Sequence, residues 1–234
     1  MSKLGLIIFS RMGSSRLPGK ALIDIEGRCL LGRVIDRAKK VRNIDQIVVA
    51  TSTKSEDDSI EKFALKENLS CYRGSENDVA MRAFETSKLH NFSSFVRLCG
   101  DRPFFDYELV SELSEFKINN NFDIVTTMFP RTYPPGLTTE IISTHSLELA
   151  LSHKLNSYDR EHLTSFFYRR SDLFTIKNFD IPIDLDLSNV HLVVDTEKDL
   201  RRSRWIAKHI TDNSNMHKII ELAKEWETNN KEKK

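Results

Sequence analysis

The segment of this 234-residue chain with the clearest chemical potential is Arg11-Met-Gly-Ser-Ser-Arg-Leu-Pro-Gly-Lys20. It places three cations, two glycines and two serines within ten residues. The glycines allow close approach of the backbone, the serines can donate hydrogen bonds, and the cations can neutralise a polyphosphate. The segment therefore predicts an anion-binding loop; a solvated basic loop is the alternative.

Two common nucleotide-binding loops do not match this segment. A P-loop has a shorter spacing between its glycines and a Ser or Thr after its lysine. Here five residues separate Gly13 from Gly19, and Ala21 follows Lys20. The Gly-x-Gly-x-x-Gly dinucleotide fingerprint is absent as well. The spacing disfavours a Walker-type ATPase and a dinucleotide-binding enzyme.

Two aspartates far apart in the sequence each follow an apolar run that predicts a strand. Asp101 comes after residues 95–99, and Asp195 comes after residues 191–194. Mg²⁺ prefers one or two carboxylates together with phosphate oxygens and water. We expect the two aspartates to converge beside the basic loop as a metal site, although either alone could cap a helix. We expect Asp199 to cap a helix or to support the metal site.

The elements that must position these residues alternate along the chain. Short apolar runs predict strands over residues 4–10, 46–52, 71–72, 95–99 and 123–127, and helical stripes lie between them. This order predicts an α/β fold with a mainly parallel (mixed) sheet, helices on both faces and the strand-to-helix loops at one edge. Further on, strands are expected over 138–143, 173–179 and 191–194, and helices over 159–170 and around 200–210.

Charge and hydropathy exclude several classes of function. Lys and Arg number 35 against 34 Asp and Glu, giving a net charge of +1, which argues against nucleic acid or an anionic membrane as the main partner. The apolar run Leu4–Phe9 is too short for a signal peptide, so we expect a cytoplasmic protein. We expect residues 1–234 to form a single domain. The break at Tyr133-Pro-Pro-Gly136 marks where an acceptor-binding or dimerisation extension, within about 130–190, would begin.

The Arg11–Lys20 segment resembles the signature loop of the cytidylyltransferases that activate acidic sugars. It is most similar to the SpsF-like branch, which resembles the CMP-Kdo and acylneuraminate cytidylyltransferases. Three later segments match family motifs in order: Arg73-Gly-Ser-Glu-Asn-Asp-Val-Ala-Met-Arg82, Val96-Arg-Leu-Cys-Gly-Asp-Arg-Pro103 and Val194-Asp-Thr-Glu-Lys-Asp-Leu200. The sequence departs from the family where Phe9-Ser10 replaces the usual Gln-Ala, and where Arg102 stands in place of smaller residues.

The resemblance implies a Rossmann-like nucleotide-diphospho-sugar transferase (GT-A-like) architecture and a homodimer. It implies transfer of CMP from CTP to an acidic sugar or another phosphorylated or acidic acceptor, with release of pyrophosphate and Mg²⁺ as cofactor, in surface polysaccharide biosynthesis. Its catalytic residues would be Arg11, Arg16 and Lys20, and its metal ligands Asp101 and Asp195. The nucleotide would contact Ser10, Met12, Gly13, Ser14, Ser15, Gly74, Ser75, Asp78 and Arg82. The acceptor would contact Arg102, Glu140, Glu161 and His162.

Several alternatives remain open at this point. Asn77 or Asp78 could cap a helix with Arg82 on a solvated face, and His162 could be a structural histidine in an amphipathic helix. Asp184-Leu-Asp186 fits the Asp-x-Asp of metal-dependent glycosyltransferases, although we interpret these residues as surface carboxylates. A nucleotidyl- or glycosyltransferase that uses another nucleotide, and a catalytically inactive nucleotide-binding partner, are the competing functions.

Overall fold

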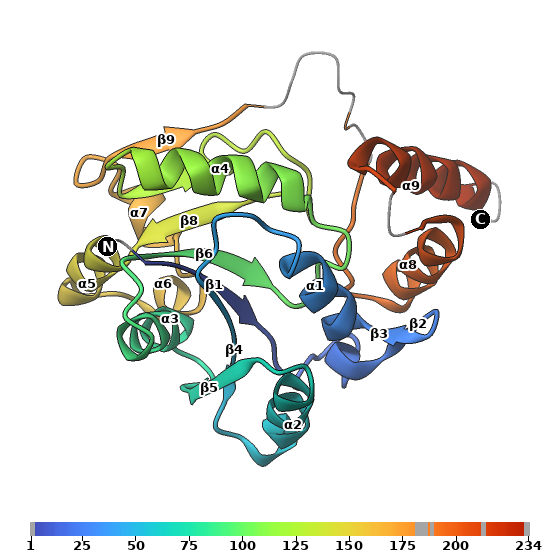
Figure 1. Ribbon diagram of the computed structural model, residues 1–234, viewed down its shortest axis with the longest axis horizontal. Helices are drawn as coiled ribbons and strands as arrows, with labels where there is room; N and C mark the ends of the chain where they lie inside the picture. Colours follow the sequence, from blue (N-terminus) through green and yellow to red (C-terminus); the bar gives the residue numbers. More distant parts are fainter. Residues whose placement is uncertain (1–2, 181–186, 188–189, 212–213, 232–234) are drawn as a thin grey trace.

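A seven-stranded sheet lies at the centre of the protein, in the order β5-β4-β1-β6-β8-β7-β9 (Figure 1). The computed structural model describes residues 3–180, 187, 190–211 and 214–231. In the seven-stranded sheet of these residues, β8 alone runs antiparallel to its neighbours, β6 and β7. The predicted mainly parallel, mixed sheet is confirmed. The strands are β1 (Leu4–Phe9), β4 (Gln46–Ser52), β5 (Ser70–Gly74), β6 (Ser94–Cys99), β7 (Ile124–Thr126), β8 (Glu140–Ser143) and β9 (Ile176–Asn178).

Helices cover both faces of the sheet because the central strands are apolar on both sides. In β1, Leu6 and Ile8 belong to one core cluster, whereas Ile7 and Phe9 belong to the other. The first cluster takes residues from α1 (Leu30–Ala38), α2 (Asp58–Lys66), α4 (Tyr107–Asn119), α8 (Glu197–His209) and α9 (Met216–Lys231). The second takes residues from α3 (Val79–Leu89), α5 (Thr144–Ser152) and α7 (Ser165–Arg169), and α6 (Ser157–Glu161) lies beside α3.

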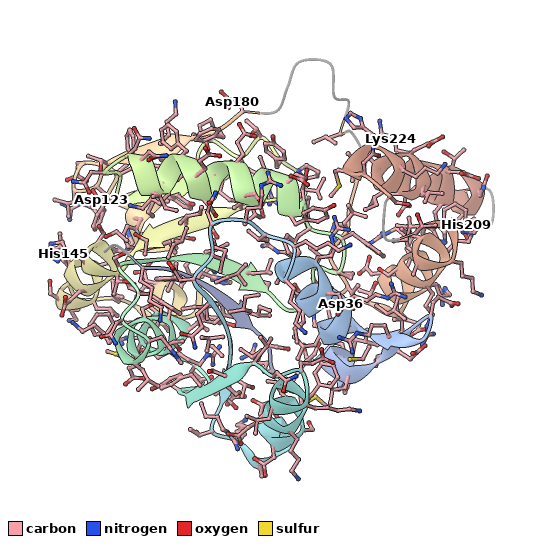
Figure 2. All side chains as sticks on the ribbon, viewed as in Figure 1. Asp36, Asp123, His145, Asp180, His209 and Lys224 are labelled. Carbon is pink, nitrogen blue, oxygen red and sulfur yellow. The ribbon has the colours of Figure 1, made fainter. Side chains whose placement is uncertain are left out.

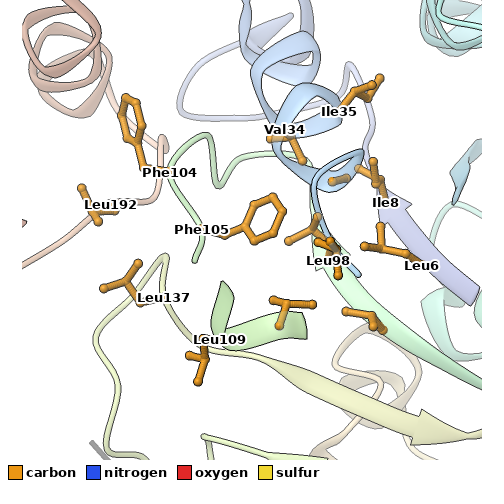
Figure 3. Close-up of a cluster of buried hydrophobic side chains, with 14 of the residues drawn as sticks. Leu6, Ile8, Val34, Ile35, Leu98, Phe104, Phe105, Leu109, Leu137 and Leu192 are labelled. Atoms are coloured by element: carbon orange, nitrogen blue, oxygen red, sulfur yellow. The ribbon is translucent and has the colours of Figure 1, made fainter. Parts of the chain in front are cut away.

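The helices are amphipathic, so their outer sides carry polar residues. Figure 2 labels Asp36, His145 and His209, which are exposed on α1, α5 and α8. Figure 3 shows the opposite situation in the first core cluster, where Val34 and Ile35 of α1 pack toward Leu98 of the sheet. None of the helices in the described residues has the length and apolar character that crossing a membrane requires.

Two short 3-10 helices and a hairpin complete the amino-terminal half. The 3-10 helix η1 (Lys20–Leu22) follows the basic loop, and the two-stranded hairpin of β2 (Asp24–Ile25) and β3 (Arg28–Cys29) precedes α1. The 3-10 helix η2 (Ser55–Asp57) joins β4 to α2. The periodic pattern did not predict the hairpin, because each of its strands has only two residues.

The strand expected over residues 191–194 does not form. Both sides of β6 are occupied by β1 and β8, so no ladder position is left beside it. The segment instead makes single backbone hydrogen bonds, from Leu192 N to the Pro135 carbonyl and from Val194 N to the Asp101 carbonyl, each 2.9 Å long. Residues 191–194 are therefore an irregular segment, in which Leu192 and Val194 are buried.

The helix expected over residues 159–170 is also wrong as one continuous element. The chain forms α6 and α7, and His162 lies between them with φ −101° and ψ 72°, outside the helical region. Asp159 stabilises this break, because its carboxylate accepts hydrogen bonds from Ser165 Oγ and from Arg169. That residues 1–234 form one domain stays a prediction.

Candidate active site

The basic loop leaves the carboxyl end of β1 and folds back on itself. The carbonyl of Met12 accepts hydrogen bonds from Ser14 N at 2.9 Å and from Gly19 N at 3.1 Å. Gly19 has φ 71°, a left-handed conformation that glycine adopts without steric cost. A Cβ on Gly13 would lie 2.8 Å from Glu56 Oε1, so the backbone passes close to η2 there. The loop ends by directing Lys20 into the molecule.

Lys20 joins the two aspartates that sequence analysis singled out. Its ammonium nitrogen lies 3.0 Å from Asp101 Oδ2 and 2.8 Å from Asp195 Oδ1. It also donates to the carbonyl of Val194 at 2.8 Å. Burial disfavours the charged amine, but Asp101 and Asp195 outweigh this effect and raise the pKa of Lys20 above its ordinary value. The structure therefore brings these three residues together; their chemical roles stay predictions.

The other two cations of the loop lie nearer the solvent. Arg16 pairs with Asp195 at 3.1 Å, and its side chain is 63% exposed. Arg11 is 3.7 Å from Glu161 of α6. Exposed ion pairs of this kind contribute little to stability. Both guanidinium groups are consequently free to exchange these partners for a phosphate.

Asp195 is positioned by the start of α8. Asp199 accepts hydrogen bonds from Asp195 N at 3.1 Å and from Thr196 N at 2.9 Å, and Thr196 caps the helix reciprocally. Arg202 pairs with Asp199 at 2.7 Å. The capping role expected for Asp199 is confirmed. Although residues 191–194 are not a strand, the bond from Val194 N to the Asp101 carbonyl keeps Asp195 at the carboxyl end of β6.

A cavity of about 400 Å³ opens between the basic loop, α3 and α6. Cationic side chains line it from three segments, the basic loop, α3 and β6, and the acids Asp101, Asp195 and Glu161 also face it. Such a cavity suits a polyanion with a divalent cation. The predicted site residues that line it are Ser10, Arg11, Gly13, Ser14, Ser15, Arg16, Lys20, Arg82, Asp101, Glu161, His162 and Asp195.

Arg82 reaches this cavity from the core, so the part of the alternative that put Arg82 on a solvated face is wrong. It is only 3% exposed, and it donates from Nη1 to the Ser75 carbonyl at 2.6 Å. Burial, followed by the charge of Arg11, lowers the pKa of Arg82 to about 10. A buried guanidinium at the cavity wall is well placed to meet an electronegative ligand atom.

Six predicted site residues do not line the cavity: Met12, Gly74, Ser75, Asp78, Arg102 and Glu140. Asp78 caps α3 by accepting from Met81 N at 2.9 Å, and it pairs with Arg160. Ser75 Oγ accepts from Asp78 N at 3.0 Å. Gly74 ends β5, where an added Cβ would lie 2.9 Å from the Tyr72 ring. Gly74, Ser75 and Asp78 therefore do not line the cavity themselves. Ser75 and Asp78 support the start of α3, which does line it.

Arg102, which follows β6, and Glu140 of β8 were predicted to contact the acceptor, but both bind other residues of the protein. Arg102 donates to the Thr138 carbonyl at 2.7 Å and to its hydroxyl at 2.9 Å. Glu140 is 2% exposed and pairs with Arg97 at 2.5 Å. Burial opposes its ionisation, but Arg97 holds the pKa of Glu140 below its ordinary value. Glu140 thus orients an arginine that does line the cavity.

Arg97 lines the cavity but was not among the predicted site residues. Its signal was present, because a charged residue inside the otherwise apolar run Phe95-Val-Arg-Leu-Cys99 must find a partner when the strand is buried. The partner, Glu140, lies across the strand pair, where the register sets the two residues opposite each other. Asp184 and Asp186 lie outside the described residues.

The donor set at Lys20 fits a hard divalent cation. Two carboxylates already converge on a positive charge, the Lys20 ammonium group. Within the described residues no cluster of three or more His, Cys, Asp or Glu side chains could hold a metal. A cation here would complete its coordination with phosphate oxygens and water, which is how Mg²⁺ binds at nucleotide sites. The arrangement suits transfer of a phosphoryl or nucleotidyl group.

Comparisons with known proteins agree with this chemistry. A family model described as cytidylyltransferase matches residues 6–229. An uncharacterized protein of Methanocaldococcus jannaschii is 34% identical over 203 residues, which cover 87% of this chain and 82% of that protein. The spore coat polysaccharide biosynthesis protein SpsF of Bacillus subtilis is 28% identical over 204 residues, covering 85% and 84%.

Solved structures show the same fold. A cytidylyltransferase from Leptospira borgpetersenii superposes with a TM-score of 0.90 at 28% identity, over 97% of this chain and 96% of that one. A CMP-2-keto-3-deoxy-manno-octonic acid synthetase complexed with CTP has a TM-score of 0.69 at 19% identity, over 89% and 100%. The Rossmann-like nucleotidyltransferase architecture is confirmed. The chain belongs to the cytidylyltransferase family.

Proposed function

We propose that this cytidylyltransferase transfers CMP from CTP to an acidic sugar and releases pyrophosphate. The observation that carries the proposal is the position of Lys20, at the floor of a cation-lined cavity and in contact with Asp101 and Asp195. Nucleotidyl transfer depends mostly on positioning and charge neutralisation, and this cavity supplies both.

In the proposed reaction an acceptor hydroxyl oxygen attacks the α-phosphorus of CTP. The bond from that phosphorus to the oxygen that bridges it to the β-phosphate breaks, and the hydroxyl proton passes to the solvent or to a nearby base. The negative charge that builds up on the departing pyrophosphate is neutralised by Arg11, Arg16 and Lys20. His162, which also lines the cavity, is the proposed contact of the acceptor hydroxyl.

Asp101 and Asp195 are the proposed ligands of Mg²⁺. When bound, the ion would neutralise phosphate charge and orient the reacting phosphate. The two aspartates are positioned before any ligand binds, because the backbone N–H of Asp195 is held by Asp199 at the start of α8 and only Gly100 separates Asp101 from the end of β6. The three donors of the Lys20 ammonium group already bind Asp101, Asp195 and the Val194 carbonyl, so Lys20 must give up at least one of these hydrogen bonds to reach a phosphate.

The acidic character of the acceptor is supported by the relatives. An 8-amino-3,8-dideoxy-manno-octulosonate cytidylyltransferase of Shewanella frigidimarina is 28% identical over 184 residues, covering 77% of this chain and 71% of that protein. SpsF, as its name states, serves spore coat polysaccharide biosynthesis. We propose the corresponding role here, the supply of an activated sugar for a surface polysaccharide.

The segment within about 130–190 is the proposed acceptor-binding and dimerisation extension. Glu161 and His162 of this segment line the cavity together with the basic loop, which supports its acceptor role. The homodimer rests on the family resemblance. The cytoplasmic location is likewise proposed from the family resemblance.

Pyrophosphate release tests the proposal directly. The purified protein is incubated with Mg²⁺, with each of CTP, UTP, ATP and GTP, and with a panel of octulosonic and nonulosonic acids, sugar phosphates, phosphonates and phospho-amino acids. We expect release with CTP and an acidic sugar. Release with another nucleotide in place of CTP would contradict the nucleotide assignment, and release with none would contradict the enzyme assignment.

A further inference from the structure

Asp57 lies directly before α2 and close to the basic loop. Aspartate in this position usually caps its own helix by accepting from the first backbone N–H groups. Asp57 makes no such bond to α2, and its side chain is fully buried. The carboxylate of Asp57 therefore forms its hydrogen bonds with groups outside α2.

The partners of the Asp57 carboxylate come from the basic loop and from the end of β4. Oδ1 accepts from Met12 N at 2.7 Å. Oδ2 accepts from Ser52 N at 3.1 Å and from the Ser52 hydroxyl. Burial opposes ionisation, but the Ser52 and Met12 donors outweigh it and lower the pKa of Asp57. The described residues include no ion-pair partner for Asp57, so these hydrogen bonds compensate its charge.

Met12 is the residue at which the two ends of the loop meet. Its N–H is held by Asp57, and its carbonyl accepts from Ser14 N and Gly19 N. Gly19 is followed directly by Lys20. Fixing the Met12 peptide groups therefore fixes both the start of the loop and the point from which Lys20 departs.

We infer that Asp57 is a positioning residue of the triphosphate site, acting through the Met12 backbone to set the shape of the basic loop and the direction of Lys20. It touches no part of the cavity itself. The inference rests on the proposed function insofar as the loop binds CTP, whereas the hold on Met12 is independent of it.

The test uses Asp57→Ala, which removes the acceptor, and Asp57→Asn, which keeps one carbonyl oxygen for Met12. The matched control is Asp123→Ala, because Asp123 is also a carboxylate held by donors from separate segments, Ser146 and Thr175. Figure 2 labels Asp123 on the side of the molecule near α5, whereas Asp57 precedes α2 in Figure 1. All three variants are expected to lose thermal stability.

Two measurements follow: hydrogen exchange of the Met12 amide without nucleotide, and CTP affinity with Mg²⁺ by calorimetry. In Asp57→Ala we expect Met12 exchange to accelerate by about tenfold or more and CTP affinity to fall by about tenfold. Asp57→Asn should show smaller changes in both, and Asp123→Ala should show neither.

Unchanged Met12 exchange in Asp57→Ala would overturn the inference. So would a loss of CTP affinity no larger than that of Asp123→Ala. If Asp57→Ala does not fold, the same two readouts of Asp57→Asn decide. If the wild-type protein binds no CTP, the proposed function fails, and the exchange of the Met12 amide alone decides whether Asp57 holds the loop.

Discussion

The ammonium group of Lys20 lies 2.8 Å from Asp195 Oδ1, although the two residues are 175 positions apart in the chain. Asp101 reaches the same ammonium group from a third segment, at 3.0 Å. A positive charge thus occupies the point where two carboxylates would share a divalent cation. Nucleotide binding and the departure of Lys20 from the aspartates are therefore coupled in the proposed mechanism.

The substitution Lys20→Met tests that coupling. Without the ammonium group the two carboxylates repel each other, so Mn²⁺, as a probe for Mg²⁺, should bind more tightly in the absence of nucleotide. Turnover of CTP should fall by orders of magnitude, because the phosphates lose a cation. Mn²⁺ titration followed by electron paramagnetic resonance measures the first effect, and pyrophosphate release measures the second.

Arg16→Met is the matched control for Lys20→Met. Arg16 also contacts Asp195, but its side chain is exposed, so its loss should change Mn²⁺ affinity less. Equal Mn²⁺ affinities for Lys20→Met and the wild type would contradict the idea that Lys20 holds the cation position.

The substitution Asp101→Asn should abolish Mg²⁺-dependent turnover of CTP without unfolding the protein. The amide keeps the size of the side chain but removes the charge that a hard cation requires. Asp36→Asn, on the exposed side of α1, is a control that removes an ion pair with Arg28 far from the cavity. Circular dichroism checks the fold. Normal turnover in Asp101→Asn would refute the metal role.

Breaking the buried pair of Arg97 and Glu140 should cost substantial stability. Glu140→Ala leaves Arg97 without its charged partner and Tyr168 without the carboxylate oxygen that accepts its hydroxyl at 2.7 Å. Loss of one partner of a buried ion pair typically destabilises a protein by about 3–5 kcal/mol. Urea denaturation measures this value, and a double-mutant cycle with Arg97→Ala separates the pair from its surroundings. A loss below about 1 kcal/mol would contradict the buried-pair assignment.

Asp159 makes the stability of the α6–α7 junction depend on pH. Its hydrogen bonds from Arg169, then those from Ser165 and Asn156, outweigh burial and lower its pKa from 3.8 to about 2. Because the folded pKa is depressed, the stabilisation is present above pH 3.8 and is lost as the pH falls toward about 2. Asp159→Asn should therefore destabilise the protein by about 1–2 kcal/mol at neutral pH, after allowance for the half-exposed Arg169.

Denaturation curves of wild type and Asp159→Asn between pH 2 and pH 7 check this prediction. The two free energies of unfolding should approach each other at the acidic end. A difference that stays constant over the whole range would show that the carboxylate charge does not contribute.

Local patterns were sufficient for most of the sheet and its helices. The run over residues 46–52 forms β4 with the predicted bounds, and the stripe around Val79 and Phe84 forms α3. Burial on both faces and helical periodicity are properties of neighbouring residues, so the sequence alone expresses them. The same holds for the dense cations and glycines of the basic loop.

The exceptions arose where a particular contact or strand pairing, and not the periodicity, determined the outcome. Residues 191–194 are as apolar as a strand, but β1 and β8 already occupy both sides of β6. Asp159, held by Arg169 and Ser165, ended α6 before His162. Hydrophobic periodicity predicts neither the occupied sides of β6 nor the hydrogen bonds of Asp159.

The sequence by itself determined the fold class and the residue types of the site, because both depend on spacing along one stretch of chain. The three-dimensional fold was needed to show which charged and polar groups meet: Arg97 with Glu140, the Met12 N–H with Asp57, and Lys20 with its two aspartates. Electrostatic attraction and hydrogen bonding act over a few ångströms in space. Partners separated by many residues in the chain therefore become evident only when the sheet and its loops are assembled.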